Sequence, residues 1–586
     1  MTINIKKLIG LIALSAALLV ALAAPVDAVL LQSIGTYRTG IFDDTAAEIP
    51  TYDPDTQRLF VANGGSKSID IISIKEPTNP SLVSTIDISV FGSNVNSVAF
   101  KNGLLAAAID ADNPQEPGKV VFFNANGDFL QSVTVGAMPD MLTFTPNGTR
   151  ILVANEGEPN SAYNVDPEGS VSIIDLFGSN SRIPAAAVRT QLFNSNANIA
   201  RRLNPSVINV GFTKFNSQIE QLRTAGVRIF GPNATVAQDL EPEYITVSED
   251  SRKAWVVLQE NNAIAVLDLS NNEFTNIIPL GFKDHSLPGN GIDASDRDNA
   301  INIANWPIQG MYQPDGFASY KVRGKTYIVT ANEGDSRDYA GFSEEVRLGN
   351  NRYPLDPTAF PNGATLKEND NLGRLTVTTA LGANSAGRFE KIYSLGSRSF
   401  SIWEWDEANS NLQQVYDSGE DFERITAQRF PEFFNSNHRE NSFDTRSDDK
   451  GPEPEDVKIA RINGRSYAFI GLERIGGVMV YNISDPQKPV FVNYFNNRNF
   501  TVPTDFNGET NPAVGDLGAE GLLFIPAKDS PNGQPLLVVA NEVSGTTTLF
   551  SVNFSRGTRR SFRQPGFLLG IMAFGSISLM KLQQKR

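Results

Sequence analysis

Carboxylates recur at two positions of a segment that this chain of 586 residues repeats. Each copy contains a carboxylate, a short apolar strand, a polar turn, a second strand and a further acidic residue. The first position holds Glu48, Asp140, Glu243, Asp315, Asp456 and Glu520, with Asn96 in the second copy. The second position holds Glu156, Glu260, Glu333, Glu473 and Glu542, with Asn63 and Asp110 in looser copies. Oxygen ligands of this kind suit a hard cation, calcium before magnesium.

The repeat itself predicts the fold. Clear copies begin at Met138, Leu240, Gln313 and Gly518, and looser copies begin at Ala47, Asn94 and Glu453. Apolar and polar residues alternate within the copies, which is typical of half-buried strands, and turn residues separate these strands. About seven copies with several strands each predict an all-β fold, a β-propeller of about seven blades with long insertions between them, some of them helical.

A propeller would arrange the repeated carboxylates around one axis. The first strand of each blade lines the central channel, so we expect the two positions to form two tiers there. Like charges converge at a cost unless protons, arginines or a cation neutralise them. Two interpretations stay open: a bound calcium ion, or carboxylates that cap strand ends and pair with Arg337, Arg474 or Arg297.

Long insertions interrupt the repeat, and functional residues often lie in such loops. The first spans about 177–238, the second starts at Gly281, the third spans about 338–397 and the fourth starts at Arg429. In the first insertion, Phe215, Ile219 and Leu222 have helical spacing and Gly226 could end the helix.

The second insertion contains a further candidate for calcium. In "GIDASDRDNA", Asp293, Asp296 and Asp298 are closely spaced. The segment does not match the EF-hand pattern, and the alternative is a solvated acidic turn.

The two histidines, His285 and His438, both lie in insertions, and their number excludes a zinc centre with several histidines. Lys283 and His285 could form a phosphate-sized pocket with Arg297 and Arg337, in which histidine acts as a general acid or base. The alternative is a histidine that is hydrogen-bonded within a loop. The sequence has neither a G-x-S-x-G nucleophile elbow nor a P-loop.

Composition narrows the functional classes. The formal net charge is −15 and the pI is about 4.9, which opposes binding to nucleic acid. The chain has no cysteine, so disulfides and thiolate metal sites are excluded. We expect a monomer.

Both ends indicate export. Lys6 and Lys7 precede an apolar run at 8–24, which predicts a signal peptide at 1–28 with cleavage after Ala28; a retained anchor is the alternative. The propeller domain is expected at 29–555. The segment 556–586 contains a short apolar run between basic residues and resembles PEP-CTERM sorting tails, although Gln564-Pro565 stands where Pro-Glu-Pro is expected. It predicts attachment to the membrane or envelope in the periplasm, at the outer surface or outside the cell; a simple short anchor is the alternative.

Several motifs resemble the bacterial choice-of-anchor I family. They include "KDHSLPGNGIDASDRDNAINIANWPIQGMYQPDGF", "TANEGDSRDY", "RFPEFFNSN", "RSDDKGPEPED" and "AFIGLERIGGVMVYNISDP". The resemblance covers about 31–552 and implies an exported propeller domain joined to varying sorting tails. Some relatives are labelled alkaline phosphatase or phytase-like, which implies a possible phosphoesterase, but no catalytic residues can be carried over.

Two functions follow as expectations. The first is a non-catalytic surface propeller that is stabilised by a metal ion and binds a cell-surface ligand or partner through its insertions. The second is a calcium-dependent phosphoesterase, in which bound calcium neutralises the phosphoester and activates water. Without a cation the acidic channel would repel a phosphate, so the enzyme interpretation requires metal.

Overall fold

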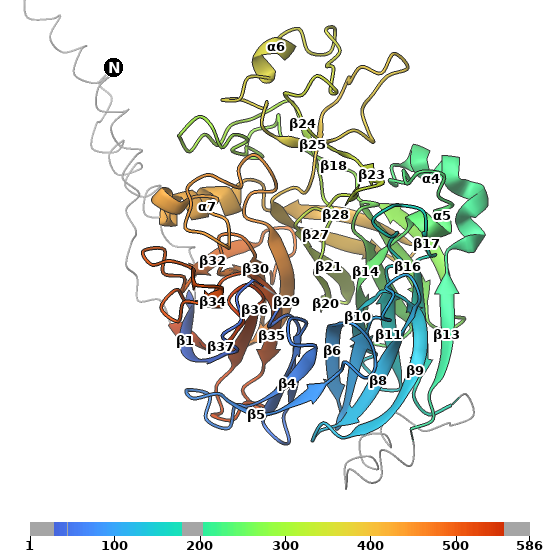
Figure 1. Cartoon of the computed structure of the whole chain (residues 1–586), viewed down its shortest axis with the longest axis vertical. Helices are drawn as coiled ribbons and strands as arrows, with labels where there is room; N and C mark the ends of the chain where they lie inside the picture. Colours follow the sequence, from blue (N-terminus) through green and yellow to red (C-terminus); the bar gives the residue numbers. More distant parts are fainter. Residues whose placement is uncertain (1–27, 44, 179–202, 556–586) are drawn as a thin grey trace, which may run out of the picture. The chain divides into compact units, whose positions relative to one another are not determined.

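Seven four-stranded antiparallel sheets make up the repeated part of the fold, in the residues that the structure describes (Figure 1). A computed structural model describes residues 28–43, 45–178 and 203–555. The prediction of an all-β propeller with about seven blades is confirmed. The predicted signal peptide, apart from Ala28, and the predicted C-terminal tail lie outside the described residues.

The first four blades each consist of four consecutive strands. Blade one has β2 (Pro50–Asp53), β3 (Arg58–Asn63), β4 (Ser68–Ser73) and β5 (Ser81–Asp87); blade two has β6 (Val95–Lys101), β7 (Leu104–Ile109), β8 (Pro117–Asn124) and β9 (Phe129–Ala137). Blade three has β10 (Pro139–Phe144), β11 (Arg150–Asn155), β12 (Ser170–Asp175) and β13 (Ser206–Gly211); blade four has β14 (Pro242–Val247), β15 (Lys253–Leu258), β16 (Ala263–Asp268) and β17 (Glu273–Pro279).

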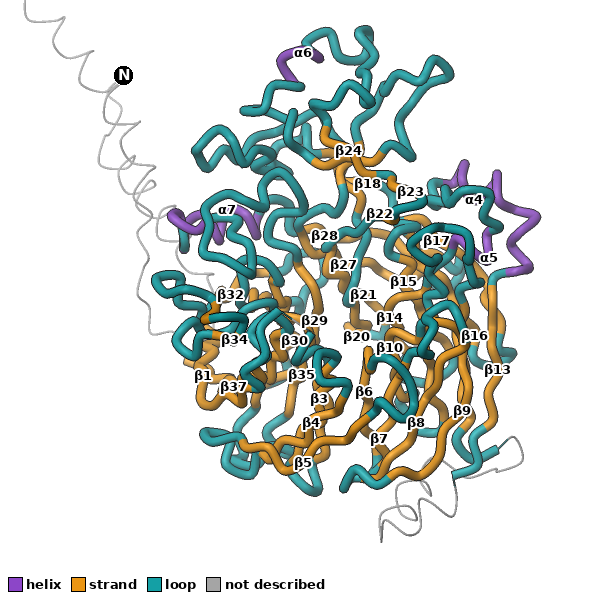
Figure 2. The backbone as a smooth tube through the Cα atoms, in the orientation of Figure 1, coloured by secondary structure: helices purple, strands orange, loops and turns teal. Residues whose placement is uncertain are grey.

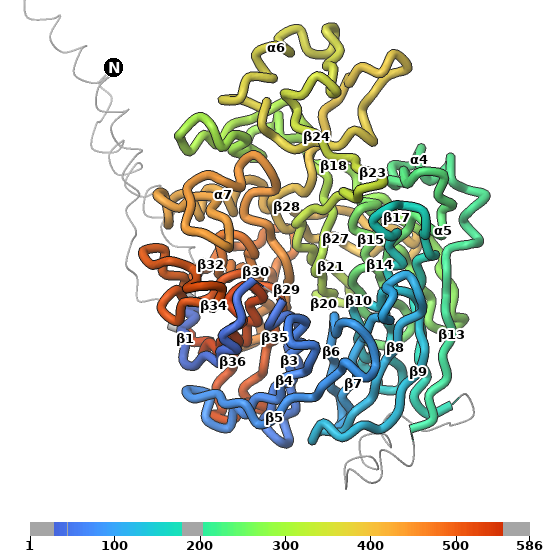
Figure 3. Tube along the Cα trace, in the orientation of Figure 1, coloured from blue at the N-terminus to red at the C-terminus, as the bar shows by residue number. Residues whose placement is uncertain are grey.

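Blades five and seven depart from this simple succession, whereas blade six again has four consecutive strands. Blade five has β20 (Phe317–Val322), β21 (Lys325–Asn332), β27 (Ser399–Asp406) and β28 (Asn411–Asp417), and blade six has β29 (Pro454–Ile462), β30 (Arg465–Leu472), β31 (Val478–Asn482) and β32 (Val490–Phe495). Blade seven has β35 (Ala519–Ile525), β36 (Leu536–Asn541), β37 (Thr546–Ser555) and, as its outer strand, β1 (Ala28–Arg38). Figure 3 shows the early β1 in the same region as the late β37. The two ends of the propeller domain therefore share one sheet.

The first strands of the blades form a ring. Each contacts the next in the order β2, β6, β10, β14, β20, β29 and β35, and β35 contacts β2. Apolar clusters fill the spaces between adjacent blades: Phe60 of β3 stacks on Phe100 of β6 with ring centroids 5.2 Å apart, and Phe469 of β30 stacks on Phe524 of β35 at 6.0 Å. A blade buries its faces only against its neighbours, so the blades stabilise one another.

The insertions contain the helices and the remaining strands of the described residues (Figure 2). The first insertion forms η1 (Thr213–Gln218), α4 (Ile219–Ala225) and α5 (Val236–Asp239). The predicted helix is confirmed, and Gly226 ends it in the left-handed conformation with φ of 107°. Glycine suits this position because it has no side chain to clash there.

The second and third insertions fold together into one five-stranded sheet. Its strands are β18 (Phe282–Asp284), β19 (Gln309–Met311), β24 (Glu345–Arg347), β25 (Thr376–Thr378) and β26 (Tyr393–Ser394). This sheet lies with α6 (Gly363–Leu366) over a separate apolar cluster that includes Tyr353 and Phe389, whose rings stack at 3.6 Å. The same region contains the hairpin of β22 (Asp338–Tyr339) and β23 (Phe342–Ser343).

The connection between blades five and six begins with α7 (Asp421–Arg429), and the fourth insertion follows it with η2 (Pro431–Phe433). A last hairpin, β33 (Asp505–Phe506) and β34 (Glu509–Thr510), precedes blade seven. Among the described residues, the helices are all too short or too polar to cross a membrane.

Candidate functional site

An irregularity in the first strand presents the repeated carboxylate to the channel. In β10 the pairing with β11 shifts between Pro139 and Leu142, and Asp140 lies in this bulge. The same shift recurs between Pro242 and Ile245 and between Ala519 and Leu522, around Glu243 and Glu520. A bulge re-aims a side chain out of the regular alternation.

One cavity of about 140 Å³ collects the first tier. Its polar lining is Glu48, Asn96, Ser97, Asp140, Glu243, Tyr244, Asp315, Glu455, Asp456 and Glu520. The structure thus brings together the first-position carboxylates predicted from the repeat. Their role as metal ligands stays a prediction.

The register of blade six differs by one residue from the one predicted. The pairing of β29 with β30 shifts between Pro454 and Val457, so Glu455 rather than Asp456 stands at the position of Asp140 and Glu243. Asp456 instead accepts a hydrogen bond from the Leu522 N–H at 2.9 Å and pairs with Lys458 at 3.0 Å. The sequence contains a signal for this register, because proline directly precedes the carboxylate in Pro139-Asp140, Pro242-Glu243 and Pro454-Glu455. Aligning the copies on this proline would have selected Glu455.

The second tier is in contact with the first. Ligand oxygens of Asp140, Glu156 and Glu243 lie within 4.8 Å of one another, and so do those of Glu333, Glu455 and Glu473. Each group combines carboxylates from both repeat positions. The channel therefore has one continuous acidic lining.

Basic side chains neutralise only one side of the second tier. Lys450 contacts Glu333 at 2.6 Å and Glu453 at 3.2 Å, and Arg474 contacts Glu473 at 3.1 Å. Nδ1 of His438 lies 3.1 Å from Glu473 and 3.9 Å from Glu542. Burial raises the pKa of Glu453, but Lys450 and the neighbouring arginines outweigh it and hold the pKa well below its usual range. The sequence did not single out Lys450 or Glu453, although the charged run "RSDDKGPEPED" contains both.

Several carboxylate oxygens in the channel have no hydrogen-bond donor. Glu48 Oε2, Glu260 Oε2 and Glu455 Oε2 are buried atoms without a partner in the described structure. Ligand oxygens of Asp315, Glu455 and Glu520 lie within 4.8 Å of one another. An unpartnered buried carboxylate oxygen is costly, so these atoms call for a proton or a cation.

The electrostatics of the channel favour uptake of positive charge. Enclosure in the protein, followed by the charge of Asp315, raises the pKa of Asp140 to about 8. Enclosure also raises the pKa of Glu260 and of Glu542 to about 8, and neighbouring carboxylates add to both shifts. The pKa values of Glu243, Glu455 and Glu520 rise for the same two reasons. Crowded carboxylates thus either share protons or surround a cation.

The predicted phosphate pocket is not assembled. Lys283 is buried and contacts Asp417 at 3.0 Å, whereas Arg337 is fully buried between Asp239 at 3.1 Å and Glu241 at 2.9 Å. Arg297 is largely exposed and pairs with Asp296 at 3.2 Å.

His285 is 1% exposed, and its Nδ1 lies 2.6 Å from the Asn290 carbonyl oxygen. Burial, and then the charge of Lys283, lowers its pKa to about 3. His285 is therefore a hydrogen-bonded loop residue, as the alternative interpretation had it. Of the arginines expected to pair with the tiers, Arg474 does so, while Arg337 and Arg297 pair elsewhere.

The three aspartates of the second insertion are separated by their partners. Asp296 pairs with Arg374 at 3.0 Å as well as with Arg297, whereas Asp293 and Asp298 have ligand oxygens within 4.8 Å of Asp444 in the fourth insertion. Sequence spacing could not reveal Asp444, because it is distant along the chain.

A larger cavity, of about 970 Å³, lies away from the tiers between blades four and five. Lys253, Lys325, Glu404 and Glu407 line it and form mutual ion pairs. It has neither the converging carboxylates nor the unpartnered oxygens of the channel.

Comparisons with known proteins place the chain in a family. It is 32% identical over 187 residues to Gigasin-3a of Magallana gigas, covering 31% of this chain and 64% of that protein. It is 28% identical over 328 residues to the mesenchyme-specific cell surface glycoprotein of Strongylocentrotus purpuratus, covering 49% of this chain and 42% of that protein. The chain therefore spans less than two thirds of either curated relative.

Among solved structures, a Kuenenia stuttgartiensis hydrazine synthase chain superposes with a TM-score of 0.40 at 11% identity, covering 89% of this chain and 99% of that one. Virginiamycin B lyase of Staphylococcus aureus gives 0.38 at 9% identity, covering 90% of this chain and 100% of that one. The choice-of-anchor I domain model matches residues 48–486, more than half of the chain. The chain belongs to the choice-of-anchor I family.

Proposed function

We propose that this chain is an exported surface propeller that binds a calcium ion in its central channel and binds a ligand or partner through its insertions. The observation that carries the metal proposal is the group formed by Asp315, Glu455 and Glu520. Their ligand oxygens lie within 4.8 Å of one another, and Glu455 Oε2 is buried without a donor. Oxygens bound to one calcium ion lie 2.3–2.6 Å from it, so opposite ligands are about 5 Å apart, which matches this spacing.

The donor set supports calcium over other metals. The tiers offer carboxylate oxygens, and His438 at their edge is already close to Arg474 and Glu473. Oxygen-only sites prefer calcium, magnesium or manganese to zinc or copper. Calcium tolerates irregular geometry, which suits a ring assembled from seven similar but unequal blades.

Family membership supports the location. Choice-of-anchor I domains occur in exported cell-surface proteins, and one similar protein is named a cell surface glycoprotein. The insertions that connect the strands near the acidic tiers are long and folded, so they offer a surface for a ligand or partner.

The metal proposal is tested by counting bound calcium on the exported full-length protein after desalting. We expect wild type to retain calcium in the channel and Glu455→Gln to lose it. Asp456→Asn is the matched control, because this neighbour is already satisfied by Leu522 and Lys458 and should keep the ion. Equal calcium content in wild type and Glu455→Gln would contradict the proposed calcium site in the channel.

The phosphoesterase alternative has weaker support. Lys450 and Arg474, which contact the second tier, are both paired with carboxylates, so neither side chain is free to bind a phosphate and the bound calcium ion would have to do so alone. We expect no hydrolysis of phosphomonoesters or phosphodiesters with calcium or with chelator. Calcium-dependent turnover that Glu455→Gln abolishes would make the channel catalytic instead.

A further inference from the structure

A second group of carboxylates lies where the second and fourth insertions meet. Asp293 and Asp298 belong to the second insertion, and Asp444 belongs to the fourth. One ligand oxygen of each lies within 4.8 Å of the others. Asp293 is 0% exposed and Asp444 is 2% exposed, whereas Asp298 is half-buried and open to solvent. The group thus has two enclosed ligands and one on the solvent side.

Two buried oxygens beside this group lack a hydrogen-bond donor. Asp444 accepts from the Ser447 hydroxyl through Oδ1 at 2.5 Å, but its Oδ2 has no partner. Asn435, which is 0% exposed, donates through Nδ2 to the same Ser447 hydroxyl at 2.8 Å, and its Oδ1 has no partner. Because each unsatisfied buried acceptor is costly, a cation bound beside the clustered carboxylates would stabilise these two oxygens.

Arg398 is the nearest cationic side chain in the hydrogen-bond network, but it does not neutralise the three carboxylates. Arg398 pairs with Glu423 and donates to the Asp293 carbonyl at 2.6 Å and to the carbonyls of Ser447 and Asp449. The guanidinium therefore donates to Glu423 and to backbone carbonyls, and it does not pair with the carboxylates of Asp293, Asp298 and Asp444. In contrast, Asp296 of the same loop is neutralised by Arg374 and Arg297.

We infer that Asp293, Asp298 and Asp444 bind a second calcium ion, with the Asn435 amide oxygen close to the site. The ligands are oxygens alone, and three carboxylates with one amide form a donor set that calcium accepts. This site is independent of the channel and does not rest on the function proposed for it.

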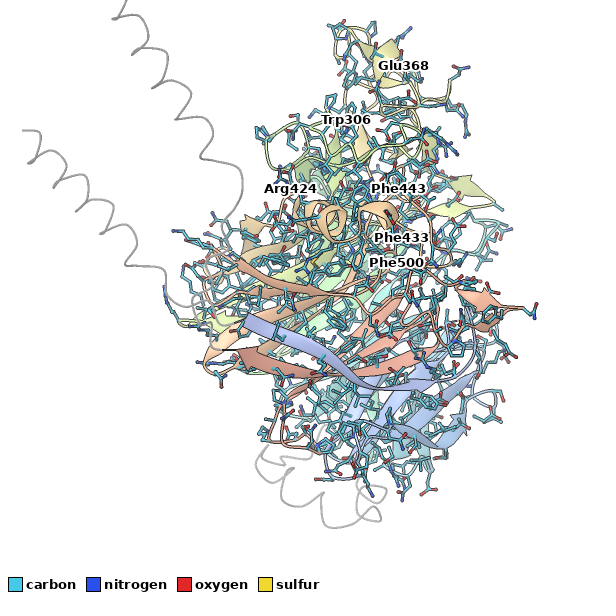
Figure 4. The ribbon with its side chains drawn as sticks, turned by 90° about the vertical axis from the view of Figure 1, so that its left-hand side faces the viewer. Trp306, Glu368, Arg424, Phe433, Phe443 and Phe500 are labelled. Carbon is cyan, nitrogen blue, oxygen red and sulfur yellow. The ribbon has the colours of Figure 1, made fainter. Side chains whose placement is uncertain are left out.

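The ion would join two insertions that are far apart in sequence. Asp444 begins the segment 444–450, in which Arg446 contacts Glu453 and Lys450 contacts Glu333 of the second tier. Figure 4 labels Phe443, which precedes Asp444, and Trp306 on the side of the molecule where α7 lies. The indole nitrogen of Trp306 donates to the Ile292 carbonyl at 3.1 Å. Binding of calcium here would therefore fix the segment that supplies basic side chains to the channel.

Three single variants test the site in the full-length protein. Asp444→Asn and Asp298→Asn should each lose one bound calcium per chain relative to wild type in elemental analysis after desalting. Asp296→Asn is the matched control from the same loop and should retain the wild-type number. Asp298 is half-buried, so its variant should fold even if Asp444→Asn does not.

A second measurement reads out the proposed link between insertions. Calcium should slow hydrogen exchange in residues 434–450 of wild type and of Asp296→Asn, but not of Asp298→Asn. The inference is overturned if folded Asp298→Asn binds as many calcium ions as wild type. Glu455→Gln separates the two sites, because it should lose only the channel ion while residues 434–450 remain protected by calcium.

Discussion

At the scale of single residues, the channel carboxylates should make stability depend on pH. The pKa values of Asp140, Glu260 and Glu542 are each raised to about 8 in the folded protein, far above those of exposed carboxyls. A carboxyl with a raised pKa binds its proton more tightly in the folded state. Its contribution to stability is complete below the unfolded-state pKa and is lost as pH rises through the folded-state value.

We therefore expect the calcium-free protein to melt at progressively lower temperature as pH rises from about 5 to about 9. Calcium should reduce this fall, because the ion stabilises the ionised carboxylates, and calcium affinity should rise with pH. Thermal melts across this range with chelator and with calcium provide the measurement and its control. A calcium-free melting temperature that stays constant or rises with pH would contradict the shared-proton view of the channel.

Blade six shows where residue-level prediction stopped. The repeat predicted which carboxylates converge, because strand order and side-chain direction follow from local pattern. It selected Asp456 instead of Glu455, because two adjacent carboxylates lie in the bulge of β29 and the local pattern did not show which of them stands at the position of Asp140. Partners such as Lys450 and Asp444 depend on how the insertions fold over the blades, and sequence spacing does not encode that.

At the scale of elements, adjacent blades approach so closely that one channel strand requires glycine. Gly521 lies in the bulge of β35, and a Cβ atom there would be 2.3 Å from the Glu48 carbonyl oxygen of the next blade. That distance is far inside van der Waals contact with backbone, so the strands would have to separate.

We expect Gly521→Ala to destabilise the protein by about 1–3 kcal/mol, as overpacking usually does. Gly211→Ala in β13 is the control, because the nearest atoms there are 3.9 Å away. Chemical denaturation of both variants measures the difference. Equal stability of the two would show that blades seven and one can move apart freely.

Elements were predicted unevenly. The strands of the blades and the helix that ends at Gly226 followed from alternation and helical spacing. The five-stranded sheet of the insertions did not, because its strands are two or three residues long and are separated by long loops. The role of β1 as the outer strand of blade seven was also missed, since its partner β37 lies at the other end of the domain.

At the scale of the whole molecule, β1 should be essential for the stability of blade seven. It pairs with β37, and Ile34 and Tyr37 pack against the apolar cluster between blades seven and one. Deleting residues 31–38 would expose the edge of β37 and remove this packing, and exposed edges promote aggregation.

We expect this deletion to lower the melting temperature and to cause aggregation, measured by calorimetry and light scattering. Gln32→Ser should behave as wild type, because it leaves the strand's backbone in place. A synthetic peptide of residues 31–38 added in trans should restore part of the stability by pairing with β37. A deletion variant as stable as wild type would show that β1 is dispensable.

The shared last sheet also sets an order of events in time. The hydroxyls of Thr36 and Thr548 lie 3.0 Å apart, although 512 positions separate them in the chain. Contacts between distant residues form slowly, because a long loop must close first. Blades one to six can assemble as the polypeptide emerges, but β1 stays unpaired until β37 has been synthesised. During synthesis and export the propeller therefore passes through an open form, whose lifetime sets the window in which chaperones or proteases can act on it.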